Sequence, residues 1–450
     1  MSRLVVRPAE RPLSGSVPVP SDKSIGHRAL IFASLSRGRS TIRGFSYGED
    51  NVATMKAFAQ MGVAFEDDGQ GTVSATGRGL DALTAPPAPI DCGNSGTTMR
   101  LLAGVLAAQP FRSQMIGDAS LSRRPMGRIA RPLRARGATI EGTQHPTRKD
   151  EITAPLEIGP LEAGIRLGGL EYKAPVSSAQ VKSALLLSGL FASGPTVVYE
   201  PIVSRDHTER MLSALGVPIR SVGTMVSLEP PANPLAIGEF DVELPGDLSA
   251  AAFVLVAGAI VGGSTVTTRR TGLNPTRAGI IDVIRAFGGA LAAETRGDVL
   301  GESFGEVTVR FSALRATPIG GELATRSIDE IPIACALAAR ATGTTVFSEV
   351  GELRVKESDR IAQMVSVLRA FGVAAEERED GMAVEGRPEG RLTAARVASH
   401  GDHRIAMSAA VLGLVADGET VIDDVDCIAT SFPRFVGTLR GLGASVEVQT

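Results

Sequence analysis

Six segments rich in small, polar and charged residues stand directly before six apolar, Ala- and Leu-rich stretches typical of buried helices. They are residues 20–28, 91–100, 174–180, 244–249, 326–332 and 399–404. A helix N-terminus offers free N–H groups and a partial positive charge, so it binds phosphate and carboxylate groups. Ser, Asp and Asn are also preferred N-caps, and capping alone would explain a single segment. Six segments, several with Lys or Arg, favour a site for anionic ligands.

A second set of segments adds cations ahead of the amphipathic helices that follow. These are residues 121–128, 203–210 and 353–360. On a helix, Lys356, Glu357 and Arg360 would share a face, because Arg360 stands three and four residues after the other two. A carboxylate held among cations stays ionised and oriented, which suits a general acid or base acting on an anionic substrate. A surface ladder of ion pairs is the alternative for the same spacing.

Two other groups of residues give weaker patterns. His400, Asp402 and His403 have a spacing that could ligate a metal, but no HExxH or CxxC motif accompanies them, which favours a polar loop. Six arginines in residues 123–136 could contact nucleic acid. Aromatic residues make up only 4% of the chain and no stacking platform goes with the arginines, so a solvated helix face is favoured.

The composition indicates a folded, soluble protein. The 450 residues fit two domains better than one core, and a formal net charge of −3 requires no nucleic-acid partner. Three widely spaced cysteines predict no disulfide framework, as in a reducing cytoplasm. The longest apolar run, residues 250–261, is too short to cross about 30 Å of hydrocarbon, and the N-terminus lacks a signal-peptide core. We therefore expect a cytoplasmic protein without a membrane segment.

Lysine is scarce in this chain. Only six of the 46 basic residues are lysines, which is typical of the Arg-rich composition that a GC-rich genome produces. Arginine stays charged and cannot shuttle protons, so a lysine retained in a motif is a candidate for chemistry that arginine cannot do. Lys23 and Lys356 are such candidates, and Lys182 is a third.

The same order of elements recurs six times along the chain: an apolar helix, a short Thr- and Val-rich strand, an amphipathic helix that closes on glycine, and further strands. The closing glycines are Gly62, Gly137, Gly216, Gly288, Gly372 and Gly443. Each copy predicts two helices and about four strands, with ordinary α/β alternation as the alternative. Pro-rich residues 230–234 indicate a boundary near residue 240, so we expect domains at residues 21–240 and at residues 1–20 with 241–450.

Several of these segments together resemble the signature motifs of one family, the 3-phosphoshikimate 1-carboxyvinyltransferases or EPSP synthases, in their divergent, class II-like group. The segments are residues 21–28, 93–100, 124–126, 177–180, 354–360 and 402–407. The resemblance runs from about residue 5 to the C-terminus. It implies an α/β fold, an inverted α/β barrel of two domains with three βαβαββ units each and an active site in the interdomain cleft.

The resemblance also implies an activity. Members transfer the enolpyruvyl group of phosphoenolpyruvate to the 5-hydroxyl of 3-phosphoshikimate and release phosphate, in the shikimate pathway to chorismate. No metal or organic cofactor is implied. The implied partners are these two small molecules alone, with no nucleic acid, no membrane and a monomeric protein. Both substrates are anionic, so the site must supply several cations.

Residues that match the family motifs take roles by the same resemblance. The contacts implied for 3-phosphoshikimate are Lys23, Ser24, Arg28, Ser177, Ser178, Ala179, Gln180, Arg205, Asp329 and Lys356. Those implied for phosphoenolpyruvate are Lys23, Asn94, Gly96, Arg124, Gln180, Arg360 and Arg404. The implied catalytic groups are Asp329, which takes the hydroxyl proton, Glu357 or Lys23, which protonates the methylene carbon, and Lys356, which stabilises the developing charge.

The chain departs from the common family pattern at two places. Thr430 stands where many members have a lysine, so no charge reaches a phosphate from there. In many members the catalytic aspartate directly follows a proline, whereas here Ile333 follows the proline. Counting back from Lys356 selects Asp329 over Glu330. Gly96 lacks the methyl group that would crowd an inhibitor, so we expect glyphosate to compete with phosphoenolpyruvate.

Two other functions stay open from the sequence. One is enolpyruvyl transfer to UDP-N-acetylglucosamine, whose enzymes share the architecture but carry a cysteine in the loop at residues 118–125, where this chain has none. The other is a non-catalytic phosphate-ligand or RNA-binding protein on the same repeat, favoured only by the arginine run.

Overall fold

The computed structural model describes residues 2–233 and 237–449, and Pro234 of the predicted boundary segment lies outside the described residues. The chain divides into two compact units, each with its own hydrophobic core. Unit 1 comprises Met1–Asp22, Pro245–Asp298 and Ser303–Thr450, and unit 2 comprises Lys23–Leu244 and Val299–Glu302. The cleft expected between two domains stays a prediction.

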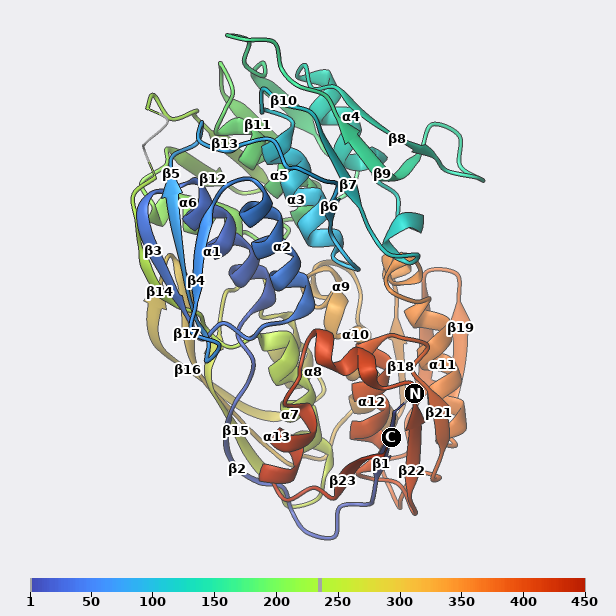
Figure 1. Cartoon of the computed structure of the whole chain (residues 1–450). Helices are drawn as coiled ribbons and strands as arrows, with labels where there is room; N and C mark the ends of the chain where they lie inside the picture. The colour runs from blue at the N-terminus through green and yellow to red at the C-terminus, as the bar shows by residue number, and fades with distance from the viewer. Residues whose placement is uncertain (1, 234–236, 450) are drawn as a thin grey trace. The chain divides into compact units, whose positions relative to one another are not determined.

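The elements of unit 2 are drawn in Figure 1. They are α1 (Lys23–Leu35), β3 (Arg37–Arg43), α2 (Glu49–Gln60), β4 (Ala64–Asp67), β5 (Thr72–Arg78), β6 (Ile90–Asp91), α3 (Gly96–Leu106), β7 (Ser113–Ile116), α4 (Gly127–Ala135), β8 (Ile140–Gln144), β9 (Ile152–Ile158), β10 (Leu170–Lys173), α5 (Ala179–Gly189), β11 (Thr196–Tyr199), α6 (His207–Ala214), β12 (Ile219–Val222), β13 (Met225–Leu228) and β14 (Asp241–Glu243).

The remaining elements belong to unit 1, apart from the turn between β16 and β17, which is grouped with unit 2. They are β1 (Arg3–Val6), β2 (Ser14–Pro18), α7 (Leu248–Ile260), β15 (Thr265–Gly272), α8 (Gly279–Ala286), β16 (Ala290–Val299), β17 (Glu302–Arg310), α9 (Gly321–Arg326), α10 (Ile331–Arg340), β18 (Thr344–Phe347), α11 (Arg360–Ala370), β19 (Ala374–Arg378), β20 (Gly381–Glu385), β21 (Arg396–Ala398), α12 (His403–Gly413), β22 (Thr420–Asp423), α13 (Phe435–Gly441) and β23 (Val446–Gln449).

The described strands form six small sheets that repeat one topology, which confirms the predicted sixfold repeat. In unit 2 the sheets are β14-β3-β5-β4, β6-β7-β9-β8 and β10-β11-β13-β12, and in each the first pair is parallel and the others antiparallel. In unit 1 they are β16-β17-β15-β2, β18-β20-β19 and β21-β22-β1-β23. Five of the six described sheets have four strands in this arrangement. The sheet β18-β20-β19 has three, and an isolated parallel bridge between Ile319 and Phe347 stands where the other sheets have their first strand.

Two repeats take their first strand from a distant part of the chain. The strand β2 lies near the N-terminus but pairs in parallel with β15, and β14 pairs in parallel with β3 from far upstream. The strand β1 likewise lies between β22 and β23, so the two ends of the described chain meet in one sheet (Figure 1). The N-terminal segment thus contributes two strands, β1 and β2, both in unit 1.

Each repeat buries its first helix and closes its second helix in the same way. Every residue of α7 and of α12 is buried, as their apolar composition predicts. The six predicted closing glycines all have φ values of +72° to +105°, a conformation that glycine adopts without a steric penalty. The next amide donates back to a carbonyl of the last turn, as Val63 does to Phe58 O, which completes a Schellman cap.

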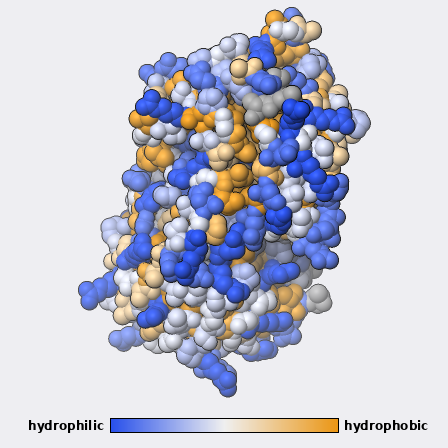
Figure 2. Space-filling model, turned by 90° about the vertical axis from the view of Figure 1, so that its left-hand side faces the viewer, coloured by the Kyte–Doolittle hydropathy of each residue, from blue (hydrophilic) through white to orange (hydrophobic). Residues whose placement is uncertain are grey.

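Polar side chains cover most of the face seen in Figure 2, with apolar patches among them.

A buried histidine joins three helices of unit 2. His27 Nδ1 of α1 lies 2.7 Å from Thr54 Oγ1 of α2, which lies 2.8 Å from Thr98 Oγ1 of α3. Burial lowers the pKa of His27 to about 3, because the protonated ring would lose its hydration. His27 therefore stays neutral in the folded protein throughout the physiological pH range.

This histidine predicts a pH dependence of stability. Its pKa falls from 6.5 to about 3 on folding, so the unfolded chain takes up the proton first and stability is lost as pH falls below 6.5. Between pH 7 and pH 5 the loss from this residue is about 2 kcal/mol. We expect His27→Gln to remove that part of the slope, measured by urea unfolding at both pH values. An unchanged slope in the variant would contradict the assignment.

Candidate functional site

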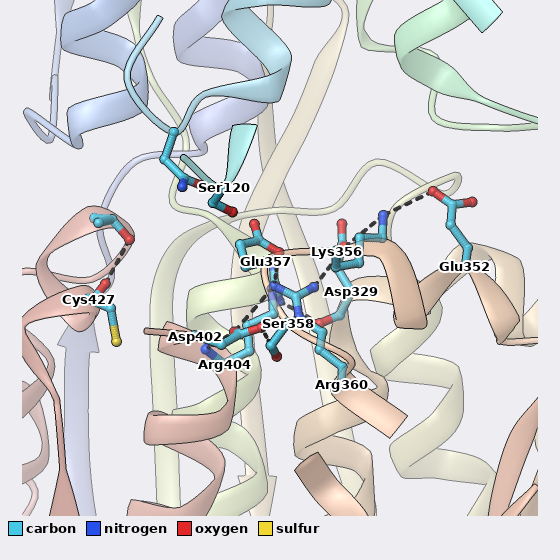
Figure 3. A network of polar contacts seen from close by, with 12 residues as sticks. Ser120, Asp329, Glu352, Lys356, Glu357, Ser358, Arg360, Asp402, Arg404 and Cys427 are labelled. Atoms are coloured by element: carbon cyan, nitrogen blue, oxygen red, sulfur yellow. Dashed lines mark hydrogen bonds and ion pairs between the residues drawn. The ribbon is translucent and has the colours of Figure 1, made fainter. Parts of the chain in front are cut away.

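Arg360, the first residue of α11, is a buried cation with only 1% of its side chain exposed. Its Nε donates to Asp402 Oδ2 at 2.8 Å and its Nη2 to Glu357 Oε2 at 2.5 Å (Figure 3). Burial alone would lower the pKa of Arg360, but Asp402 and Glu357 outweigh burial and raise it. Burial alone would raise the pKa of Asp402, but the neighbouring Arg360 outweighs burial and lowers it. Both groups therefore stay charged.

Asp329 lies beside two cations of the same unit. Its Oδ1 lies 3.7 Å from Lys356 Nζ and 3.7 Å from Arg360 Nη1. Lys356 also pairs with Glu352 Oε1 at 3.1 Å (Figure 3). The side chains of Asp329, Lys356 and Glu357 keep exposures of 16%, 24% and 27%, so a ligand can reach them. We call Asp329, Lys356, Glu357, Arg360 and Arg404 the unit 1 cluster.

Arg404, the second residue of α12, is anchored by the segment that carries Asp329. Its Nη1 donates to the Asp329 main-chain oxygen at 2.6 Å and lies 3.6 Å from Glu330 Oε1. Glu330 is 1% exposed and also faces the buried Arg277 at 3.8 Å. Of the two adjacent acids, Glu330 thus faces only buried arginines among these cations, whereas Asp329 also faces the partly exposed Lys356.

The prediction of a helix through Lys356, Glu357 and Arg360 is wrong about where the helix begins. Residues Gly351–Val355 form a 3-10 turn, and α11 begins only at Arg360. Asp359 caps this helix by accepting from Ala362 N at 3.1 Å, so the preceding residues lie outside it. Glu357 nevertheless reaches Arg360, because the bend before α11 turns its carboxylate toward the guanidinium.

In unit 2, the start of α1 carries Lys23, Ser24 and Arg28. Lys23 Nζ pairs with Asp50 Oδ2 at 2.7 Å, at the start of α2. Arg28 is 3% exposed and donates to Thr208 Oγ1 at 2.7 Å, to Ser24 O at 2.9 Å and to a serine of α5. Arg28 therefore joins α1 to α5 and α6, while Lys23 and Ser24 are only partly buried.

The start of α3 lies beside two arginines. Arg124 Nη2 donates to Asn94 Oδ1 at 2.6 Å, and Asn94 Nδ2 donates to Asp118 Oδ2 at 2.7 Å. A Cβ on Gly96 would lie 2.7 Å from Arg100 Nη1 and 3.3 Å from Arg124 Nη1. The glycine thus leaves room for both guanidinium groups at a helix N-terminus, an arrangement suited to an anion.

Gln180 at the start of α5 is held by the neighbouring helix α3. Its Oε1 accepts from Arg100 Nη1 at 2.7 Å and its Nε2 donates to Thr97 Oγ1 at 3.0 Å. Ala179 is the first residue of α5 and Ser178 its N-cap.

The remaining predicted contacts lie on two loops of unit 2. Ser177 Oγ accepts from Ile202 N at 2.9 Å, which links the loop before α5 to the loop before α6. Arg205 is partly buried in this second loop. Unit 2 thus carries its predicted residues at the starts of α1, α3 and α5 and on the loops before α4, α5 and α6.

The structure also shows where the residues of the weaker sequence patterns lie. No group of three or more potential metal ligands occurs within residues 2–233 and 237–449. Asp402 of the weak metal pattern instead holds Arg360, while Arg136 of the arginine run is 4% exposed and donates to Ser188 Oγ at 2.6 Å. The hydroxyl of Thr430 donates to the Cys427 carbonyl in its own turn. In the part of the chain that is described, no helix has the length and apolar character to span a membrane.

Sequence reasoning missed the residues that hold the predicted ones. Asp50, Arg100 and Thr97 anchor Lys23 and Gln180. Arg100 and Thr97 belong to a segment that the sequence singled out, but Asp50 follows no motif. Its only signal is its place in the first turn of an amphipathic helix.

Two α/β units built on one repeat, with cations held at the starts of buried helices, define a protein made to bind anionic groups. The profile of the family described as EPSP synthase (3-phosphoshikimate 1-carboxyvinyltransferase) matches residues 8–439. The chain belongs to this family.

Individual relatives agree with the family match. A 3-phosphoshikimate 1-carboxyvinyltransferase of Citrifermentans bemidjiense is 48% identical over 98% of this chain and 99% of its own length. The enzyme of that name from Geobacter metallireducens is 47% identical over 99% and 100%. A structure of EPSP synthase from Acinetobacter baumannii has a TM-score of 0.88 at 39% identity and covers both chains fully. The predicted fold class is thereby confirmed.

The geometry around Arg360 predicts a large effect of removing its anchor. Asp402→Asn leaves a buried guanidinium with one carboxylate fewer, so we expect unit 1 to lose about 3 kcal/mol of unfolding free energy. The matched control is Asp423→Asn, which breaks the exposed pair with Arg396 and should cost less than about 1 kcal/mol. Urea unfolding measures both variants. Equal losses would show that Asp402 is not a buried anchor.

Proposed function

We propose that the protein transfers the enolpyruvyl group of phosphoenolpyruvate to the 5-hydroxyl of 3-phosphoshikimate and releases phosphate. The observation that carries this proposal is membership of the EPSP synthase family over residues 8–439. The cations at the helix starts of both units support it, because each substrate carries a carboxylate and a phosphate. Arginine provides the planar pairing that suits these groups.

The unit 1 cluster would carry the proton transfers. In the proposed reaction the 5-hydroxyl oxygen attacks C2 of phosphoenolpyruvate while Asp329 takes the hydroxyl proton and C3 gains a proton. The resulting tetrahedral adduct then loses a proton from its methyl group and expels phosphate, which forms the enol ether. Lys356, beside Asp329, would stabilise the charge that develops on oxygen.

Glu357 and Lys23 remain the candidates for the proton donor to C3. Glu357 is hydrogen-bonded to Arg360, and Lys23 is paired with Asp50. Each is only partly buried, which supports a role in contact with substrate. Arg124, Arg360 and Arg404 would bind phosphoenolpyruvate.

The residues proposed to bind the acceptor belong to two groups, one in each unit. Lys23, Ser24, Arg28, Ser177, Ser178, Ala179, Gln180 and Arg205 would bind 3-phosphoshikimate, together with Asp329 and Lys356 of the unit 1 cluster. Because Arg28 already donates to three protein oxygens, it would act mainly by fixing the start of α1.

The test of this function is phosphate release from mixed substrates. We expect the purified protein to release phosphate when phosphoenolpyruvate and 3-phosphoshikimate are mixed, and not when UDP-N-acetylglucosamine replaces the acceptor. Release only with the sugar nucleotide would assign the other enolpyruvyl transfer. No release with either acceptor, while both anions still bind, would favour a non-catalytic protein.

The proposed acid–base roles predict a separation of turnover from binding. Glu357→Gln and Asp329→Asn remove a titratable group but keep the side-chain shape, so each should lower kcat by about 100-fold or more. Dissociation constants for both substrates should change by less than about fivefold. Glu352→Gln, which alters only the other partner of Lys356, is the matched control. Turnover that survives either of the first two changes would remove that residue from the mechanism.

A further inference from the structure

Lys182 is a buried lysine in the first turn of α5 that the proposed mechanism does not use. Its side chain is 2% exposed, and its Nζ lies 2.8 Å from Glu200 Oε2 and 2.8 Å from Glu209 Oε1. It also donates to the main-chain oxygen of Ser204 at 3.2 Å. A buried ammonium is costly unless it is paired, and here three acceptors match its three N–H donors.

The charges of Lys182, Glu200 and Glu209, here called the triad, depend on one another. Burial would lower the pKa of Lys182, but Glu209 and Glu200 outweigh burial and raise it, so the lysine stays charged. Burial raises the pKa of Glu209, and the ammonium of Lys182 opposes that rise. Lys182 is therefore the group that makes two buried carboxylates tolerable at one place.

Glu200 extends this triad to both loops that carry predicted phosphate ligands. Its Oε1 accepts from the backbone N–H of Ser178 at 3.1 Å and from Ser204 Oγ at 2.6 Å, and its Oε2 accepts from Ser204 N at 3.2 Å. Ser178 is the N-cap of α5 and follows Ser177, while Ser204 directly precedes Arg205. One carboxylate thus fixes the backbone on either side of the proposed phosphate contacts.

An arginine could not replace this lysine. The guanidinium is planar and directs its donors outward in a fork, whereas the two carboxylates and the Ser204 carbonyl surround a single nitrogen. Lysine is rare in this chain, with only six copies, and at this position the contacts require the compact ammonium group.

We propose that Lys182 and Glu200 are positioning residues for the phosphate of the acceptor. They hold Ser177, Ser178 and Arg205 in one arrangement and do not contact substrate themselves. Lys182 also offsets negative charge that would otherwise lie behind a site for a phosphate dianion. This inference rests on the proposed function, which assigns those three residues to 3-phosphoshikimate.

The test compares kinetics of the full chain with Lys182→Met, Lys182→Arg and Glu200→Gln. We expect each variant to raise KM for 3-phosphoshikimate about tenfold or more, with kcat and the KM for phosphoenolpyruvate within about threefold. Inhibition by shikimate, which lacks the phosphate, should be unchanged. The control is Lys56→Met, an exposed lysine on α2, which should behave as the wild type.

The possible outcomes separate this inference from the proposed function. If the wild type releases no phosphate from the two substrates, the proposed function fails whatever the variants do. If the wild type is active but the variants affect both substrates equally, weaken shikimate as much as 3-phosphoshikimate, or lower only thermal stability, the positioning role is wrong. Where Lys182→Met does not fold, Glu200→Gln decides, because it keeps the lysine and the size of the side chain.

Discussion

A cation that serves an anionic ligand must first be kept stable in the empty protein, and this constraint organises both units. An uncompensated charge beneath the surface costs several kcal/mol, so each such cation needs an anchor of its own. Lys23 has Asp50 at 2.7 Å, Arg360 has Asp402 at 2.8 Å, and Arg404 has the main-chain oxygen of Asp329 at 2.6 Å. The anchors also fix the side-chain conformations, so little entropy remains to be lost on binding.

The repeat explains why these anchored cations occur at the starts of helices. Each copy contains a buried helix, and the backbone N–H groups of its first turn have no partner within the helix. Ser95, Ser178, Asp247 and Asp402 cap four of these helices through their side chains. Asp402 performs two tasks, because it caps α12 and holds Arg360 of α11. Side-chain capping is therefore observed at these four helices, and anion binding at the same helix ends stays a prediction.

The sequence predicted what depends on local pattern and family motif. The six closing glycines, the buried helix at residues 250–261 and the motif residues could be identified in this way, because spacing and residue type determine them. The pairing of β2 with β15 and of β14 with β3 could not be predicted, because in each pair the two strands lie more than 190 residues apart in the sequence. Nor could the anchors, because Asp402 stands 42 residues from Arg360 and becomes its partner only through packing. The bend at Lys356 also escaped prediction, since helical spacing alone does not show where a cap ends the preceding turn.

The contacts of the few lysines show how their surroundings differ. Genome composition explains why most basic residues are arginines, but it does not explain where the lysines remain. Lys182 is surrounded by three acceptors and is almost fully buried, whereas Lys23 and Lys356 have one or two carboxylate neighbours and stay partly exposed. The first environment uses the shape of the ammonium, and the other two leave part of the side chain exposed. Burial therefore distinguishes Lys182, which we propose as a positioning residue, from Lys23 and Lys356, which we propose as contacts of substrate.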